Sequence, residues 1–229
     1  LHTDKVYEPD LNSFTIEPFP YYSPLKSQIE TIKSFDRPVI LVDDLVHTAN
    51  RLQVLVPQLR EDGIPIKKVV VGVLSGYGRD LMQCLKVPVE SIYSMPNLRQ
   101  WFVESTLYPF IGGDTVRREE MKVAGLQPSI NMILPYATPR LSGCSREALV
   151  EFSACCIENS RDLFQVLEAE YRKMYAKNLT LSRLSEAVIL PLCPDKGSCM
   201  EYDENLAASV YLENDLETLW RMKEFLIKG

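Results

Sequence analysis

Two adjacent acids, Asp43 and Asp44, stand between an apolar run and a short loop that contains a hydroxyl side chain. The run Pro38–Val42 predicts a buried strand that ends at the acids, and a segment with helical spacing begins at Thr48. Carboxylates at this point can accept hydrogen bonds from the vicinal hydroxyls of a ribose, directly or through Mg2+. The start of the following helix offers free N–H groups to a phosphate. The spacing therefore predicts a sugar-phosphate site.

Structural alternatives stay open for the same residues. Acids commonly end a parallel strand and cap the next helix, which would explain Asp43 and Asp44 without a ligand. His47 lies in the loop, where a histidine is often solvated or caps a helix, although its neutral imidazole N–H can also bind phosphate.

Residues Val39–Arg51, VILVDDLVHTANR, resemble the phosphoribosyl pyrophosphate (PRPP) motif of type I phosphoribosyltransferases. That motif has four apolar residues, two acids, two or three spacers, Thr, Gly or Ala, a spacer and usually Thr. The resemblance implies that Asp43 and Asp44 hold the ribose hydroxyls and are the catalytic candidates. It implies that the 5′-phosphate is wrapped by His47, Thr48, Ala49, Asn50 and Arg51. Mg2+ is the implied cofactor, held through the ligand or by Asp43 and Asp44.

The chain departs from the family pattern at two points. Arg51 occupies a position that is usually a small hydroxyl residue, and only 37 residues precede Pro38, where the family has its pyrophosphate-binding and catalytic loops. One hypothesis is an enzyme that transfers phosphoribosyl to a base-like acceptor, with further parts outside this chain. Another is a non-catalytic nucleotide-sensing or assembly domain at the C-terminal end of a multidomain protein, with a nucleotidyltransferase-like domain upstream. A purely structural domain is the third.

Two glycine-containing segments are secondary candidates. Ser75, Gly76, Tyr77 and Gly78 follow the next predicted strand, so the glycines could admit a pyrophosphate or base, with Tyr77 available for stacking; a tight strand-to-helix turn explains them equally well. Ile111–Asp114, with Arg117 and Arg118 downstream and Glu104–Thr106 upstream, could form a phosphate-attracting lid. A plain turn followed by a charged helix is the favoured interpretation of this second segment.

The elements that would position these residues alternate between strand and helix. Strands at 38–42, 66–74 and 87–93 alternate with a helix from Thr48 that ends at Gly63 and a helix at 79–85. The first helix has apolar spacing at Leu52, Leu55, Val56 and Leu59. This order predicts an α/β fold with a parallel sheet and flanking helices. The resemblance implies that this sheet is phosphoribosyltransferase-like, and the order of strands and helices fits that family.

The rest of the chain predicts an arm and a helical subdomain. Residues 1–24 are rich in Pro and aromatic residues and predict an extended arm, with Ser23 and Pro24 opening a helix to about Ser34. We expect the α/β domain over 25–140 and a C-terminal helical subdomain over 141–229. Its helices are expected from Ser145 to about Lys177, after Thr180 through Ala187, and from a cap at Asn214 and Asp215.

Composition narrows the function classes. The 229 residues are 46% hydrophobic and 24% charged, with net charge -6 and scattered basic residues, which argues against nucleic acid as the main ligand. Apolar runs are far shorter than the roughly 20 residues of a membrane span. The six cysteines include no Cys-x-x-Cys pair and there are two histidines, so a zinc site is not expected.

We expect a cytoplasmic protein, whose partners are a small phosphosugar or nucleotide and either an upstream domain or a second copy. The Leu1 start predicts a domain cut from a longer chain.

Overall fold

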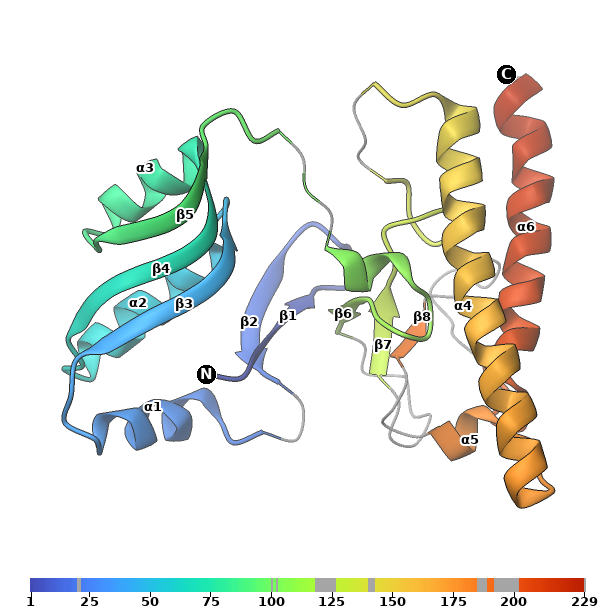
Figure 1. Cartoon of the computed structure of the whole chain (residues 1–229), viewed down its shortest axis with the longest axis horizontal. Coiled ribbons are helices and arrows are strands. Elements are labelled where there is room, and N and C mark those ends of the chain that lie inside the picture. The colour runs from blue at the N-terminus through green and yellow to red at the C-terminus, as the bar shows by residue number, and fades with distance from the viewer. Residues whose placement is uncertain are drawn as a thin grey trace. The chain divides into compact units, whose positions relative to one another are not determined.

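The computed structural model describes residues 1–19, 22–99, 101, 103–117, 127–139, 143–184, 189–191 and 202–228 (Figure 1). The chain forms two compact units, which we call unit 1 and unit 2. Unit 1 comprises residues 1–5 and 16–101, and unit 2 comprises 6–15 and 102–229. This division differs from the predicted boundaries at 24 and 140, because the short elements after residue 102 pack with the C-terminal helices.

Unit 1 contains a three-stranded sheet in which both neighbouring pairs are parallel, in the order β3-β4-β5. The predicted alternation of strand and helix is confirmed. The elements are α1 (Leu25–Lys33), β3 (Val39–Val46), α2 (Asn50–Glu61), β4 (Ile66–Ser75), α3 (Gly76–Cys84) and β5 (Val89–Met95).

Burial of α2 against the sheet builds the core of unit 1. The predicted stripe is confirmed, because Leu52, Leu55, Val56 and Leu59 are all buried. Leu52 and Val56 pack in one cluster with Val69, Val71 and Met82, and Leu59 packs with Ile29 of α1. The α1 helix begins after Pro24, which takes the cap position predicted for Ser23, and is followed by Ser34.

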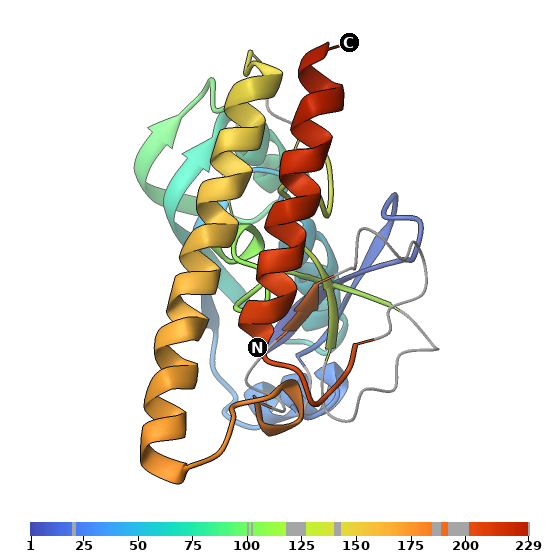
Figure 2. The same cartoon turned by 90° about the vertical axis from the view of Figure 1, so that its right-hand side faces the viewer.

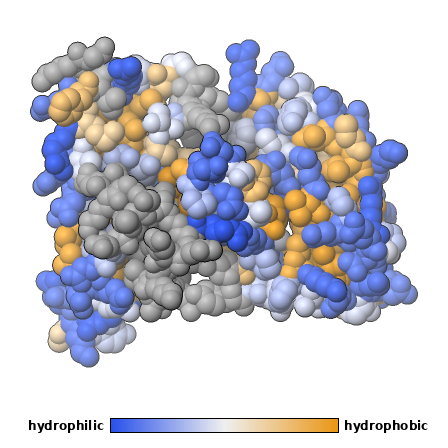
Figure 3. Space-filling model, turned by 180° about the vertical axis from the view of Figure 1, so that it is seen from behind, coloured by the Kyte–Doolittle hydropathy of each residue, from blue (hydrophilic) through white to orange (hydrophobic). Residues whose placement is uncertain are grey.

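One face of this parallel sheet is open. β3, β4 and β5 lie in the sheet in the same order as in the sequence. Right-handed crossovers between them therefore place α2 and α3 on the same face, as Figure 1 shows. The other face exposes Ile40, Val42 and Ile92, with Val42 at 78%. The prediction that the Pro38–Val42 segment is covered on both faces is therefore wrong. The surface seen from behind in Figure 3 mixes hydrophobic and hydrophilic residues.

Within residues 1–24, where the sequence predicted an arm, the described part forms two strands. The strands β1 (Thr3–Tyr7) and β2 (Phe14–Pro18) are joined by a short loop and lie at one end of a second sheet, in the order β2-β1-β6-β7-β8. The prolines do not prevent this, because Pro9 lies in the loop and Pro18 ends β2.

The second sheet also corrects the prediction for the middle of the chain. It contains β6 (Asp114–Val116), β7 (Gln127–Ile130) and β8 (Ile189–Pro191). β1 pairs with β6 in parallel, and β7 pairs with β8 in parallel. β6 and β7 are antiparallel. The charged helix expected from Thr115 is a strand as far as Val116, and its continuation from 118 lies outside the described residues. The described residues 98, 99, 101 and 103 of the expected helical piece at Leu98–Glu104 are not helical, and the 3-10 helix η1 (Glu104–Leu107) begins at its last residue. The loop expected at 191–197 begins on Pro191, the last residue of β8, and its remainder is outside the described part.

Two long helices, α4 (Arg146–Tyr175) and α6 (Ala208–Lys228), lie side by side in unit 2, with the short α5 (Leu181–Leu184) between them in sequence (Figures 1 and 2). The predicted cap Ser145 is confirmed, since its Oγ accepts from Ala148 N at 3.2 Å. The α6 helix begins before the expected cap at Asn214 and Asp215. The physical reason is that Asp215 is buried and accepts a hydrogen bond from Tyr136 Oη at 2.5 Å instead of capping the backbone.

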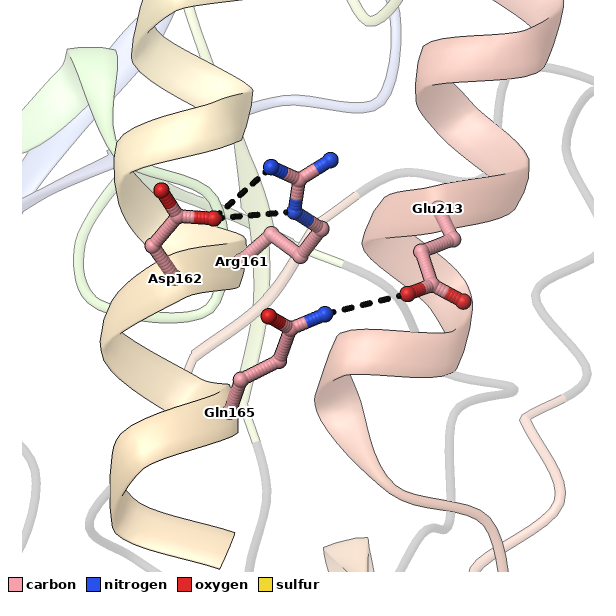
Figure 4. Close-up of polar contacts among 4 residues, drawn as sticks. All are labelled: Arg161, Asp162, Gln165 and Glu213. Carbon is pink, nitrogen blue, oxygen red and sulfur yellow. Dashed lines mark hydrogen bonds and ion pairs between the residues drawn. The ribbon is translucent and has the colours of Figure 1, made fainter.

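Polar contacts accompany the apolar interface between α4 and α6. Gln165 Nε2 donates to Glu213 Oε1 at 3.1 Å across the helices, while Arg161 bonds to its neighbour Asp162 (Figure 4). Glu168 accepts from both the backbone N and the Oγ of Ser209 and so caps the first turn of α6. Within the described residues, no helix combines the length and hydropathy that crossing a membrane requires.

The apolar contact between α4 and α6 generates a stability prediction. Leu212 of α6 is fully buried, so Leu212→Ala should lower the free energy of unfolding of the whole chain by about 2–5 kcal/mol through lost burial and a cavity. Leu163→Ala is the matched control, because Leu163 of α4 is 46% exposed and should change stability by about 0.5 kcal/mol or less. Urea unfolding followed by circular dichroism measures both. Equal effects would contradict this packing.

Candidate functional site

The acid pair lies inside strand β3, not after it. β3 continues through Leu45 and Val46 because these residues stay in register with Val73 and Leu74 of β4. Asp43 is half-buried, while Asp44 is exposed. Asp43 Oδ1 accepts from Asp44 N at 3.1 Å, and Asp44 Oδ1 accepts from Leu45 N at 2.7 Å. The predicted strand end at Val42 is therefore wrong by four residues.

The carboxyl group of Asp43 is held in an unfavourable environment for a charge. Burial raises its pKa above the ordinary value, a hydrogen bond with the Asp44 side chain raises it further, and the Arg51 charge lowers it in part. A carboxylate perturbed by burial and by a neighbouring acid is typical of functional sites, and it costs stability at neutral pH.

The predicted phosphate loop comes together at the first turn of α2. Ala49 is the residue before the helix and adopts a left-handed conformation, with φ of 50°, and no side chain caps the helix. Among the described residues, the first N–H groups of α2 thus have no side-chain acceptor at the positive end of the helix dipole. Thr48 and Asn50 are half-buried and Arg51 is exposed at this turn. His47 is also half-buried and Ala49 is buried, so four of the five residues 47–51 have exposed surface at this junction.

Ser75 connects this loop to the next one. It is the last residue of β4 and caps α3, with Oγ accepting from Gly78 N at 2.9 Å. The same Oγ lies 2.8 Å from His47 Nδ1, although the two residues are 28 positions apart. Ser75 is 1% exposed, so this contact is shielded from water.

Aromatic rings surround His47. Its ring centroid lies 4.3 Å from that of Trp101 and 5.8 Å from that of Tyr77, both in tilted arrangements. Tyr77 is 56% exposed and Trp101 41% exposed, so both rings also face solvent. Tyr77 was predicted as a stacking candidate, but Trp101 was missed. Its position after β5 is the signal that could have found it, because residues after parallel strands meet at one edge of a sheet.

The glycines of the Ser75–Gly78 segment have a packing explanation. A Cβ on Gly76 would lie 2.6 Å from the carbonyl oxygen of Pro96, and one on Gly78 would collide with the carbonyl oxygen of Val46. Both glycines thus let α3 start close against the chain that follows β5 and the end of β3. This supports the tight-turn interpretation of these two positions.

The second glycine segment belongs to unit 2 and is packed as a turn. Gly112 is buried, and its carbonyl oxygen accepts from Asn131 Nδ2 at 2.8 Å. The Arg117 guanidinium bonds to Glu8 at 3.2 Å and to Thr15 at 3.1 Å. These contacts favour a structural turn over a lid. Arg118 lies outside the described residues.

The described part of the chain contains no cluster of three or more His, Cys, Asp or Glu residues that could hold a metal ion. Burial raises the pKa of Cys156 in α4 to about 11, which keeps its thiol protonated, while Cys155 is exposed. Cys193 and Cys199 lie outside the described residues.

A hollow of about 220 Å³ in unit 2 lies beside Glu168, Arg172 and Leu179. Its charged side chains are engaged by the chain itself, since Glu168 binds Ser209 and Arg172 Nε donates to Asn178. The edge of the unit 1 sheet is therefore the stronger candidate site.

No protein-family model matches the chain, and searches of the curated proteins and of the solved structures found no significant match either. The fold is an α/β arrangement with one parallel and one mixed sheet. The phosphoribosyltransferase resemblance stays a prediction from the motif.

The raised pKa of Asp43 predicts that its carboxylate lowers the free energy of unfolding in a pH-dependent way. The folded state binds the Asp43 proton more tightly than the unfolded chain does. At a pH above the raised pKa, the ionised carboxylate therefore lowers the stability of the fold. At a pH below the ordinary pKa, the group is protonated in both states and has no such effect. Asp43→Asn should therefore raise the urea midpoint at pH 7, with a gain that shrinks as the pH falls to about 3.8. Asp80→Asn, at an exposed position of α3, is the control. A gain that grows on acidification would contradict the assignment.

The approach of α3 to β3 predicts that Gly78→Ala is harmful. Alanine favours a helix over glycine by about 1 kcal/mol, but the new Cβ meets the backbone of Val46, which cannot rotate away. We expect a net loss of about 1–3 kcal/mol in unfolding free energy, measured by urea unfolding. Tyr77→Ala, at the exposed neighbouring position, should cost less. A Gly78→Ala chain as stable as the parent would show that this contact is not close.

Proposed function

We propose that unit 1 binds a phosphorylated ribose compound, PRPP or a nucleoside monophosphate, together with Mg2+. The observation that carries the proposal is the uncapped first turn of α2 directly after a strand with two carboxylates. The N–H groups of this turn and Arg51 suit the 5′-phosphate, while Asp43 and Asp44 suit the ribose hydroxyls. These roles are the ones that the motif resemblance implies.

The acid pair also fits Mg2+. Asp43 is half-buried, and burial together with the neighbouring Asp44 side chain raises the pKa of its carboxyl group, so a cation beside the pair would relieve an unfavourable charge. Mg2+ is usually bound by one or two carboxylates together with phosphate oxygens and water. When bound with the ligand, the ion would offset the negative charge of the acids and the phosphates.

If the domain is an enzyme, its reaction transfers phosphoribosyl to a base-like acceptor. Asp43 and Asp44 would orient the ribose and residues 47–51 would anchor the phosphate. Catalysis would then come mainly from positioning and from stabilisation of charge in an oxocarbenium-like transition state.

A non-catalytic nucleotide-sensing or assembly domain is the second candidate. In the described residues, β3 is an edge strand of a three-stranded sheet. No described strand of this sheet lies beyond β3 to position further loops next to the acids. This arrangement favours ligand binding without transfer.

Calorimetric titration of the chain with PRPP, AMP, CMP and ribose 5-phosphate, each with and without Mg2+, tests the proposal. We expect saturable binding that Mg2+ strengthens and that the double variant Asp43→Asn/Asp44→Asn weakens by at least about tenfold, because charged hydrogen bonds to the ribose are lost. The matched control is Asp36→Asn/Asp80→Asn, which removes two exposed acids of unit 1.

Binding that the acid variant leaves unchanged would contradict the site, and absence of binding to all four compounds would contradict the function. Pyrophosphate release from PRPP in the presence of purine and pyrimidine bases separates the two candidates. Release that depends on Asp43 and Asp44 indicates the transferase, and binding without release indicates the sensor.

A further inference from the structure

The hydrogen bonds of Ser75 determine where its single proton goes. Its Oγ already accepts the N–H of Gly78 at 2.9 Å, and the side chain is shielded from water. The remaining contact is to His47 Nδ1 at 2.8 Å. If Nδ1 carried a proton and donated it, the Ser75 hydroxyl proton would have no described acceptor, which is unfavourable for a buried group. The satisfied arrangement is therefore Ser75 O–H donating to an unprotonated Nδ1.

This arrangement selects one tautomer of the neutral imidazole. With Nδ1 as acceptor, the ring proton must reside on Nε2, on the side of the ring away from Ser75. Trp101 and Tyr77 lie beside the same ring and restrict its rotation. In the part of the chain that the structure describes, Nε2 has no hydrogen-bond partner of its own.

The free Nε2–H belongs to the loop that precedes the uncapped start of α2. His47 is two residues before Ala49, so the imidazole donor and the first N–H groups of α2 are on the same short segment. Several donors on one short segment suit the oxygens of a phosphate monoester.

We propose that Ser75 is a positioning residue: it donates to His47 Nδ1 and so presents Nε2–H as a hydrogen-bond donor to the ligand phosphate. The donor role toward a phosphate rests on the proposed function, whereas the tautomer of His47 does not depend on it. It also gives Ser75 a role beyond the cap of α3, because it joins the loop after β3 to the loop after β4.

Nitrogen NMR of the intact chain tests the tautomer without any ligand. Only two histidines are present, so the ring signals of His47 can be assigned by comparison with a His2→Gln chain. We expect a protonated Nε2 and an unprotonated Nδ1 at pH 8. Ser75→Ala should give a mixture of tautomers, and Ser75→Thr, which keeps the hydroxyl, should restore the single form. Ser27→Ala, at an exposed serine of α1, is the control.

AMP with Mg2+ is the probe for the donor role. A glutamine amide can place its N–H near the position of Nε2, whereas an asparagine amide is too short, so His47→Gln should bind AMP at least about tenfold more tightly than His47→Asn. Ser75→Ala should weaken AMP binding about fivefold, because less of the protein presents the competent ring.

A proton on Nδ1 in the parent chain, or an unchanged tautomer in Ser75→Ala, would overturn the inference. Equal AMP affinities of the His47→Gln and His47→Asn chains would overturn the donor role. If AMP does not bind the parent chain, the proposed function and the donor role fail together, while the tautomer spectra still decide whether Ser75 positions the ring.

Discussion

Parallel pairing of β3, β4 and β5 is the constraint on which the candidate site depends. Parallel strands place their carboxyl ends at one edge of a sheet, so the loops after all three strands meet there. The pairing also requires crossover helices, and these begin at that edge with their positive ends. His47 and Trp101 follow β3 and β5, and Ser75 is the last residue of β4, so these three residues come together only because the strands are aligned in this way.

Several features of the candidate site are unfavourable for the stability of unit 1. Asp43 is half-buried beside another acid, Ala49 adopts a left-handed backbone, and α2 starts without a side-chain cap. In contrast, the adjacent α3 is capped by Ser75, and its glycines fit closely against neighbouring backbone. The junction between β4 and α3 thus has a side-chain hydrogen bond to its first turn. The junction between β3 and α2 has backbone N–H donors without a side-chain cap. A ligand with hydroxyl and phosphate oxygens would satisfy the second junction.

Local patterns predicted much of unit 1 and of the long helices. The buried stripe of α2, the order of strands and helices, and the Ser145 cap are confirmed because each depends on residues close in sequence. Strand ends were less predictable. The acids suggested that β3 stops at Val42, but pairing with Val73 and Leu74 continues it to Val46. Likewise, Asp215 lies inside α6 because Tyr136, a distant residue, satisfies its carboxylate.

The amino-acid sequence by itself determined the acid pair, the loop that follows it and the helical and strand periodicities, since these are properties of neighbouring residues. Only the tertiary structure decided that Ser75 bonds to His47, that Trp101 lies against the same ring and that one face of the parallel sheet is open. It also placed β1, which lies within the predicted arm, beside β6 in a sheet. These features depend on contacts between residues far apart in the chain, which periodicity and spacing do not encode.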